Sequence, residues 1–167
     1  MNKIKKILIM PKALFKSRKL IKNLYSSLYQ YLILRKQNIE LKLRNGETII
    51  ISRFHYPRLI YYYYLGYIEN INKDIIYFKI NNKNFQLPLK EIELLGLGHI
   101  IKIIKANWLY YKNYWEKNNV RFKHVYGAIY EIFEDEDYKF LDVKDKNVLD
   151  IGAFVGDSAI YFYSKRG

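Results

Sequence analysis

The sequence has 167 residues, half of them hydrophobic, and a formal net charge of +13. Its length suits one ordinary domain, or a small domain with part of another. It contains no cysteine and only three scattered histidines, His55, His99 and His124, which excludes disulfides and thiolate catalysis and gives no reason to expect a metal site.

Apolar segments are short throughout the sequence. No stretch approaches the roughly 20 apolar residues that cross a bilayer. The N-terminal apolar run over residues 7–10 stops at Pro11, which is too soon for the core of a signal peptide. We therefore expect a cytoplasmic protein.

Residues 1–38 form a basic region, because no acid precedes Glu40. Within it, apolar residues at steps of three and four predict an amphipathic helix over residues 16–35. We favour a helix that packs its apolar stripe on the next domain and leaves its lysines in water. The functional alternative is a basic helix that binds nucleic acid or an anionic membrane surface.

Residues 39–141 are expected to form a mixed α+β region with two hairpins. In the first, alternating apolar residues from Ile39 lead to Asn45-Gly46, which predicts a type I′ turn, and a return strand over residues 47–52. Pro57 then suits the first turn of a helix, and Gly66 suits its end. The four consecutive tyrosines in this helix point in different directions and are interpreted as mixed packing and surface.

The second hairpin is predicted from the β-branched and aromatic run Ile75–Ile80, the polar turn after it, and alternation that continues to Leu89. A helical stripe then extends to about residue 116. Residues 120–133 resemble a strand, with Gly127 as a bulge. An acidic cluster follows, and a solvated turn is the favoured interpretation over a cation site or a general base. The cluster consists of Glu131, Glu134, Asp135, Glu136 and Asp137.

The pattern of residues 147–162 is that of a strand, a glycine turn and a helix. Doubly wound sheets usually place a phosphate or a cofactor at such a corner. Gly152 allows a ligand to approach the backbone, and Gly156 allows tight entry into the helix. Asp157 or Ser158 can cap the free amides of that helix, and Asp150 can accept hydrogen bonds at the end of the strand.

Two residues distinguish this corner from a dinucleotide-binding site. The dinucleotide fingerprint is Gly-x-Gly-x-x-Gly, and it places a pyrophosphate at the helix N-terminus. Here Phe154 occupies the position of the middle glycine, and Asp157 puts an acid where phosphates would lie. An acidic corner suits a cationic cofactor without phosphates, so we expect S-adenosylmethionine, which carries a sulfonium and an ammonium group.

The same stretch resembles the first motif of class I S-adenosylmethionine-dependent methyltransferases, and most closely that of the FkbM family, which typically reads Asp-Ile-Gly-Ala-Asn-x-Gly-Asp-Ser. The matching residues are Asp150, Ile151, Gly152, Ala153, Gly156, Asp157 and Ser158, with Phe154 in place of the Asn. The resemblance extends upstream to about Val125. It implies a Rossmann-like fold, cofactor binding by Asp150, Gly152, Ala153, Phe154, Gly156 and Asp157, and methyl transfer to a hydroxyl of a sugar or another small molecule.

We therefore expect residues 142–167 to be the first strand and helix of an incomplete Rossmann-like domain. The ribose-binding acid, the adenine loops and the substrate pocket of a methyltransferase do not follow in this sequence, and no catalytic base can be assigned. The chain is then the N-terminal part of a longer enzyme, or half of a split enzyme completed by a partner chain. Alone it should be inactive, with cofactor binding undetectable by calorimetry. The alternative from another class is a small basic module that binds nucleic acid or an anionic membrane.

Overall fold

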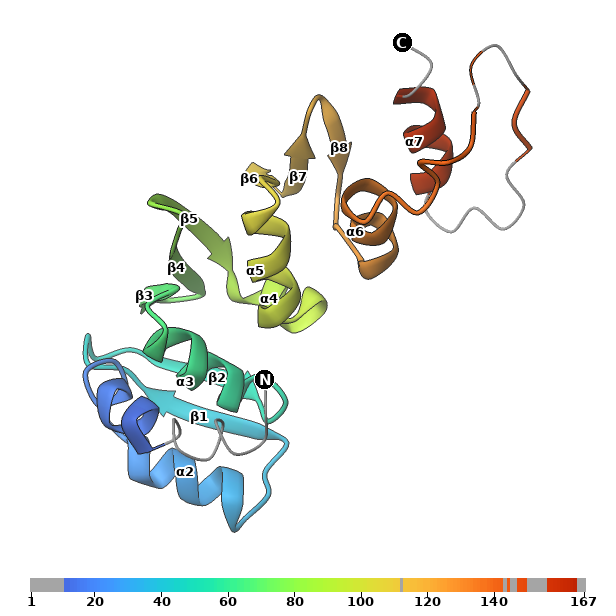
Figure 1. Cartoon of the computed structure of the whole chain (residues 1–167). Coiled ribbons are helices and arrows are strands. Elements are labelled where there is room, and N and C mark those ends of the chain that lie inside the picture. Colours follow the sequence, from blue (N-terminus) through green and yellow to red (C-terminus); the bar gives the residue numbers. More distant parts are fainter. Residues whose placement is uncertain (1–10, 112, 143, 145–146, 150–155, 165–167) are drawn as a thin grey trace. The chain divides into compact units, whose positions relative to one another are not determined.

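The computed structural model describes residues 11–111, 113–142, 144, 147–149 and 156–164. These residues form helices and three small antiparallel sheets, which confirms the predicted α+β class (Figure 1). The chain divides into two compact units, Met1–Lys105 and Ala106–Gly167. No described helix is long and apolar enough to cross a membrane. The predicted domain boundary before residue 142 lies inside the second unit and stays a prediction.

The first predicted hairpin is confirmed. Strand β1 (Asn38–Lys42) pairs with strand β2 (Thr48–Ser52) in an antiparallel ladder. Alternate residues share one face of a strand, and the inward face of this hairpin is fully apolar. Its buried side chains are Ile39, Leu41, Ile49 and Ile51.

The turn of this hairpin differs from the predicted type I′ turn. That turn needs positive φ at both central residues, whereas Gly46 has it (φ 93°) and Asn45 does not. The loop is a three-residue one, in which Gly46 N donates to Leu43 O at 3.2 Å and Leu43 N donates to Glu47 O at 2.7 Å. The Asn45 side-chain amide instead donates to the Ile71 carbonyl oxygen at 3.1 Å, which ties the loop to a neighbouring strand.

The predicted single helix over residues 16–35 is wrong. Residues 11–17 are helical and α2 (Leu24–Leu32) follows, but the segment between them turns along the hairpin, where Ile21 forms a β-bridge with Leu43. This bridge satisfies backbone groups at the edge of β1 and buries Ile21, which explains the break. Two flanking hydrogen bonds run from Lys22 N to Lys42 O at 2.7 Å and from Arg44 N to Leu20 O at 2.9 Å.

Helix α3 (Tyr56–Tyr64) confirms the helix predicted around Pro57. Pro57 lies in its first turn, where a missing N–H costs nothing, and Gly66 beyond its end has φ 79°. The four tyrosines of residues 61–64 are all half-buried, as expected for mixed packing and surface. The helix contacts strand β3 (Ile68–Asn72).

The second hairpin is also confirmed, and a third strand joins it. Strand β4 (Ile75–Ile80) pairs with β5 (Lys83–Pro88) on one side and with β3 on the other. The tight turn is formed by Asn81 and Asn82, both with positive φ (53° and 59°). This is the geometry that asparagine tolerates best among residues with a side chain.

Two helices close the first unit. Leu89 was predicted to continue the strand alternation, but it begins α4 (Leu89–Leu95) directly after Pro88, which has no N–H for a further ladder bond. Gly96, with φ 82°, separates this helix from α5 (Leu97–Lys105). Helix α5 contacts α3 and β4, and its buried side chains are Leu97, Ile100, Ile101, Ile103 and Ile104.

The helix predicted to reach about residue 116 ends at Lys105, so its second half is wrong. Asn107 has φ 66°, which no right-handed helix accommodates. A three-stranded sheet follows: β6 (Leu109–Tyr111), β7 (Tyr114–Lys117) and β8 (Val120–Phe122). Asparagines with positive φ form its turns, at Asn113, Asn118 and Asn119.

The predicted strand over residues 120–133 is correct only as far as Phe122. Helix α6 (Gly127–Glu134) occupies the rest, and Gly127 is its first residue rather than a bulge. Ile129 and Ile132 are buried three residues apart, the spacing of one helix face. Helix α6 packs on α7 (Asp157–Ser164) through aromatic contacts. Phe133 of α6 contacts Tyr161 at 5.5 Å between ring centroids, and Tyr138, which follows α6, contacts Phe162 at 5.2 Å.

The predicted corner at residues 147–162 is described only in part. Residues 147–149, the start of the predicted strand, have no regular secondary structure, and residues 150–155 lie outside the described part. The helix expected after the glycine turn is confirmed as α7. The ladders among the described strands are all antiparallel, so a Rossmann-like domain, which needs parallel strands, is not confirmed.

Candidate functional site

Of the six predicted cofactor-binding residues, the structure describes Gly156 and Asp157. The other four, Asp150, Gly152, Ala153 and Phe154, lie outside the described residues. Gly156 has φ 75°, a conformation in which side chains are strained, and its carbonyl oxygen accepts a hydrogen bond from Ile160 N at 3.0 Å. It therefore acts as the residue that turns the chain into α7.

Asp157 is the first residue of α7 and is only 4% exposed. Its Oδ1 accepts a hydrogen bond from Ser158 N at 3.1 Å, so the carboxylate lies against the free amides of the first turn. A carboxylate in this place is stabilised by the positive end of the helix dipole. It also adds negative charge to the corner, which disfavours phosphates and suits a cationic ligand.

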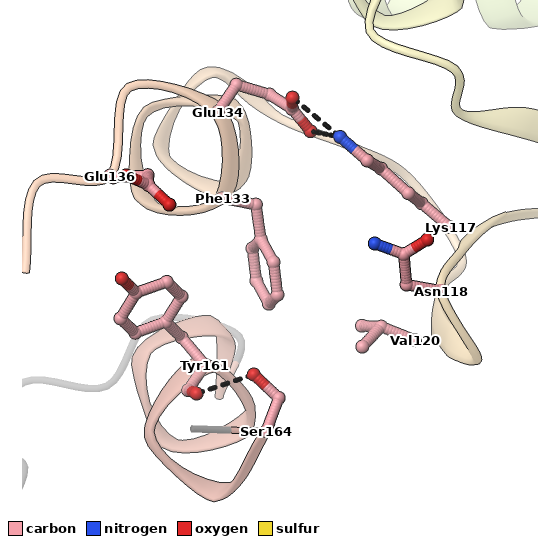
Figure 2. A pocket seen from close by; sticks show the side chains of 8 residues that line it. All are labelled: Lys117, Asn118, Val120, Phe133, Glu134, Glu136, Tyr161 and Ser164. Carbon is pink, nitrogen blue, oxygen red and sulfur yellow. Dashed lines mark hydrogen bonds and ion pairs between the residues drawn. The ribbon is translucent and has the colours of Figure 1, made fainter. Parts of the chain in front are cut away.

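A pocket of the second unit lies beside the same helix (Figure 2). It is an open cavity of about 490 Å³ between the β7–β8 hairpin, the end of α6, and α7. Its lining residues are Lys117, Asn118, Val120, Phe133, Glu134, Glu136, Tyr161 and Ser164. Tyr161 and Ser164 lie roughly 6 and 10 Å beyond Asp157 along the helix axis, at 1.5 Å per residue, so the pocket is lined by the later turns of α7 and not by its first residue.

The Glu134 carboxylate is the main polar group of this pocket. Both of its oxygens accept from Lys117 Nζ at 2.7 Å, and Oε1 also accepts from Trp108 Nε1 at 2.7 Å. The Trp108 ring is fully buried, and the Lys117 and Glu134 side chains are 23% and 13% exposed. Figure 2 shows the ammonium group aimed at the carboxylate across the rim of the pocket.

This network is structural rather than catalytic. Glu134 already accepts three hydrogen bonds from charged or buried donors, which leaves it little capacity to take a proton from a substrate. Three of its acidic neighbours, Glu131, Asp135 and Asp137, are exposed, as expected for a solvated turn. The role of Glu134 was not predictable from the sequence, because Trp108 and Lys117 are 26 and 17 residues away and reach it only through the β6–β7 turn.

His55 is the other buried ionisable group that stands out. It is 3% exposed, and burial lowers the pKa of its imidazole, against the opposing effect of the Glu93 carboxylate. Its Nε2 lies 3.7 Å from Glu93 Oε2, and its Cε1 is close to Gly96. Within the described part of the chain, Glu93 and Arg58 are the charged groups that act on it, and we interpret it as a packed, neutral histidine. Among the described residues, no group of three or more histidine, aspartate or glutamate side chains could hold a metal ion.

Comparisons with family models, curated proteins and solved structures gave no match to this chain. The methyltransferase resemblance therefore rests on the residues of the 147–162 stretch, and it is carried forward as a proposal.

Proposed function

We propose that residues 142–167 begin the cofactor-binding domain of an S-adenosylmethionine-dependent methyltransferase of the FkbM type. The observation that carries this proposal is the run from Asp150 to Ser158, which follows the family's first motif at every position except Phe154. Helix α7 supports it, because it begins at Asp157 directly after a glycine with positive φ, as the motif requires.

The chemistry of the corner suits this cofactor. S-adenosylmethionine carries two positive charges and no phosphate, and Asp150 and Asp157 supply carboxylates on both sides of the glycine turn. Methyl transfer is an in-line displacement from the sulfonium sulfur to a nucleophile, so the protein acts mainly by positioning the reactants. Phe154 occupies the position where the family usually has asparagine, and a phenylalanine side chain cannot donate the hydrogen bond of that asparagine.

The proposed activity needs residues beyond this corner. A ribose-binding carboxylate is expected after the next strand, and residues 158–167 contain no acid. In our proposal a hydroxyl of a sugar or another small molecule accepts the methyl group. The residues of this corner alone should hold the cofactor weakly, because they supply only part of the contacts that such a site needs.

A ligand titration followed by NMR tests the cofactor assignment at the affinity expected for one corner of a site. A dissociation constant of about 1–5 mM corresponds to roughly 3–4 kcal/mol of binding free energy. We therefore expect S-adenosylmethionine, added up to about 5 mM, to shift the backbone amide signals of residues 148–160 in a saturable way. S-adenosylhomocysteine lacks the sulfonium charge and should shift the same signals less. Asp157→Asn should remove that difference.

The matched control is Asp137→Asn, which removes an exposed carboxylate of the same unit. It should leave both titrations unchanged. If neither ligand shifts the amides of residues 148–160, or if both shift them equally in the unmodified chain, the S-adenosylmethionine assignment is wrong.

A further inference from the structure

We propose that the exposed face of α2 and the segment after it form a docking surface for anionic lipid membranes. The surface consists of Phe15, Tyr25, Tyr29, Leu32, Ile33 and Leu34 together with the nearby cations Arg18, Lys19, Lys22, Arg35 and Lys36. We call it the α2 surface. It belongs to the first unit and does not depend on the cofactor assignment.

Four apolar residues of the α2 surface share one helical face: Tyr25, Tyr29 and Leu32 in α2, and Ile33 at its C-cap. Positions 25, 29, 32 and 33 are spaced by four, three and one residues, which places them within about 100° of arc on a helix at 3.6 residues per turn. Their exposed fractions are 69% for Tyr25, 54% for Tyr29, 53% for Leu32 and 65% for Ile33. The opposite face carries buried Leu24 and Ser27 and packs against β1. Helix α2 therefore has two apolar faces, and only one of them is used by the fold.

Basic residues flank this apolar face at both ends of the helix. Arg18, Lys19 and Lys22 precede the helix and Arg35 follows it, and all four are exposed. The Arg18 guanidinium lies 5.5 Å from the centroid of the Tyr25 ring and 5.9 Å from that of Phe15, so cation and aromatic residues share one surface. No acid occurs in the sequence before Glu40, and none of the described carboxylates forms an ion pair with these cations.

The combination of side chains identifies a lipid surface rather than a nucleic acid. Tyrosine rings prefer the level of the lipid head groups, and lysine and arginine attract anionic lipids, so both kinds of residue suit a membrane interface. Leu32, Ile33 and Leu34 add exposed aliphatic groups, which cannot stack on bases or bind phosphates but gain by entering the acyl boundary. On a nucleic acid these three side chains would stay in water.

Vesicle sedimentation of the full chain tests this surface directly. We expect binding to phosphatidylcholine vesicles that contain phosphatidylglycerol, little binding to vesicles of phosphatidylcholine alone, and weaker binding as salt is raised. The double substitution Leu32→Asn/Ile33→Asn should lower the partition coefficient at least tenfold. Lys19→Gln/Lys22→Gln should lower it about thirtyfold on the anionic vesicles only, because each basic residue near the surface adds about 1 kcal/mol of attraction to anionic lipid.

Matched controls come from the same unit. Ile50 and Leu94 are 62% and 50% exposed but lie outside the α2 surface, so Ile50→Asn/Leu94→Asn should leave the partition coefficient unchanged. Lys83→Gln/Lys90→Gln is the control for charge, because both lysines are exposed. Far-UV circular dichroism checks that each variant is folded.

Two results would overturn the proposal. One is the absence of binding to anionic vesicles at low salt by the unmodified chain, which needs no variant. The other is equal binding by the chain and by a folded Leu32→Asn/Ile33→Asn variant. Salt-sensitive binding to single-stranded DNA that survives this double substitution, without vesicle binding, would assign the cations to nucleic acid instead.

Discussion

Removal of the Glu134 carboxylate should destabilise the second unit strongly. Glu134→Ala deletes the acceptor for Lys117 Nζ and for Trp108 Nε1, each at 2.7 Å. Nothing else in the described structure replaces it for the indole of Trp108, whose ring is fully buried. A buried donor left without an acceptor loses its hydrogen bond and cannot bond to water instead, so the folded state bears the full desolvation penalty of that group.

The magnitude follows from the burial of the three groups. Removing one partner of a fully buried ion pair costs about 3–5 kcal/mol, and a hydrogen bond to a charged group contributes about 1.5–3 kcal/mol. The Lys117 side chain is 23% exposed and can turn toward water, which lowers the cost of losing its partner. We therefore expect Glu134→Ala to lower the free energy of unfolding by about 2–4 kcal/mol, and Glu134→Gln, which keeps one acceptor oxygen, by about half of that.

Tryptophan fluorescence isolates this effect. The chain has two tryptophans, Trp108 and Trp115, and both are buried in the second unit, so urea unfolding followed at their emission reports on that unit alone. Glu131→Ala is the matched control, because Glu131 is an exposed residue of the same helix and loses the same charge. It should change the free energy of unfolding by less than about 0.5 kcal/mol. Equal unfolding midpoints for Glu134→Ala and Glu131→Ala would refute the reasoning.

Two further predictions concern His55 and Gly156. Burial lowers the pKa of the His55 imidazole below its usual value of 6.5, so its contribution to stability is complete above pH 6.5 and is lost as pH falls through the lower folded-state pKa. The first unit should therefore lose stability as pH falls below 6.5, and His55→Gln, but not His99→Gln, should flatten this dependence in urea titrations of NMR signals from that unit; an unchanged dependence would contradict a buried neutral His55. Gly156→Ala should cost about 1–2 kcal/mol because its φ is 75°, whereas Gly127→Ala at the start of α6 should be neutral or stabilising. Faster hydrogen exchange of the Ile160 amide in Gly156→Ala alone would confirm this, and equal rates in both variants would contradict it.

Local signals predicted the first unit well. The strands around Asn45-Gly46 and Asn81-Asn82 were found because alternation and turn residues act over a few positions. The type of the first turn was not predictable, since the Asn45 side chain is used in a tertiary bond to Ile71. The N-terminal helix was predicted as continuous because its interruption depends on a bridge between Ile21 and Leu43, which no local pattern records.

The second unit was predicted poorly for a different reason. Trp108 and Trp115 are both buried and lie seven residues apart, which is the spacing of residues on one face of a helix. In the structure the turn of the β6–β7 hairpin lies between them. The missed signal in the sequence was the pair of asparagines at positions 107 and 113. Asparagine adopts positive φ more readily than most residues other than glycine, and both of these residues have it. The Glu134 network was not predictable either, because Trp108 and Lys117 are 26 and 17 residues away from Glu134.

The most direct test of the cofactor assignment is photo-crosslinking with methyl-labelled S-adenosylmethionine. Trypsin cuts after Lys146 and after Lys165, so one peptide, residues 147–165, contains the whole predicted cofactor loop and α7. We expect the label in this peptide, with its yield reduced by excess unlabelled cofactor and by Asp157→Asn. Label spread over other peptides, or label that unlabelled cofactor does not displace, would contradict the proposal that this stretch is a corner of an S-adenosylmethionine site.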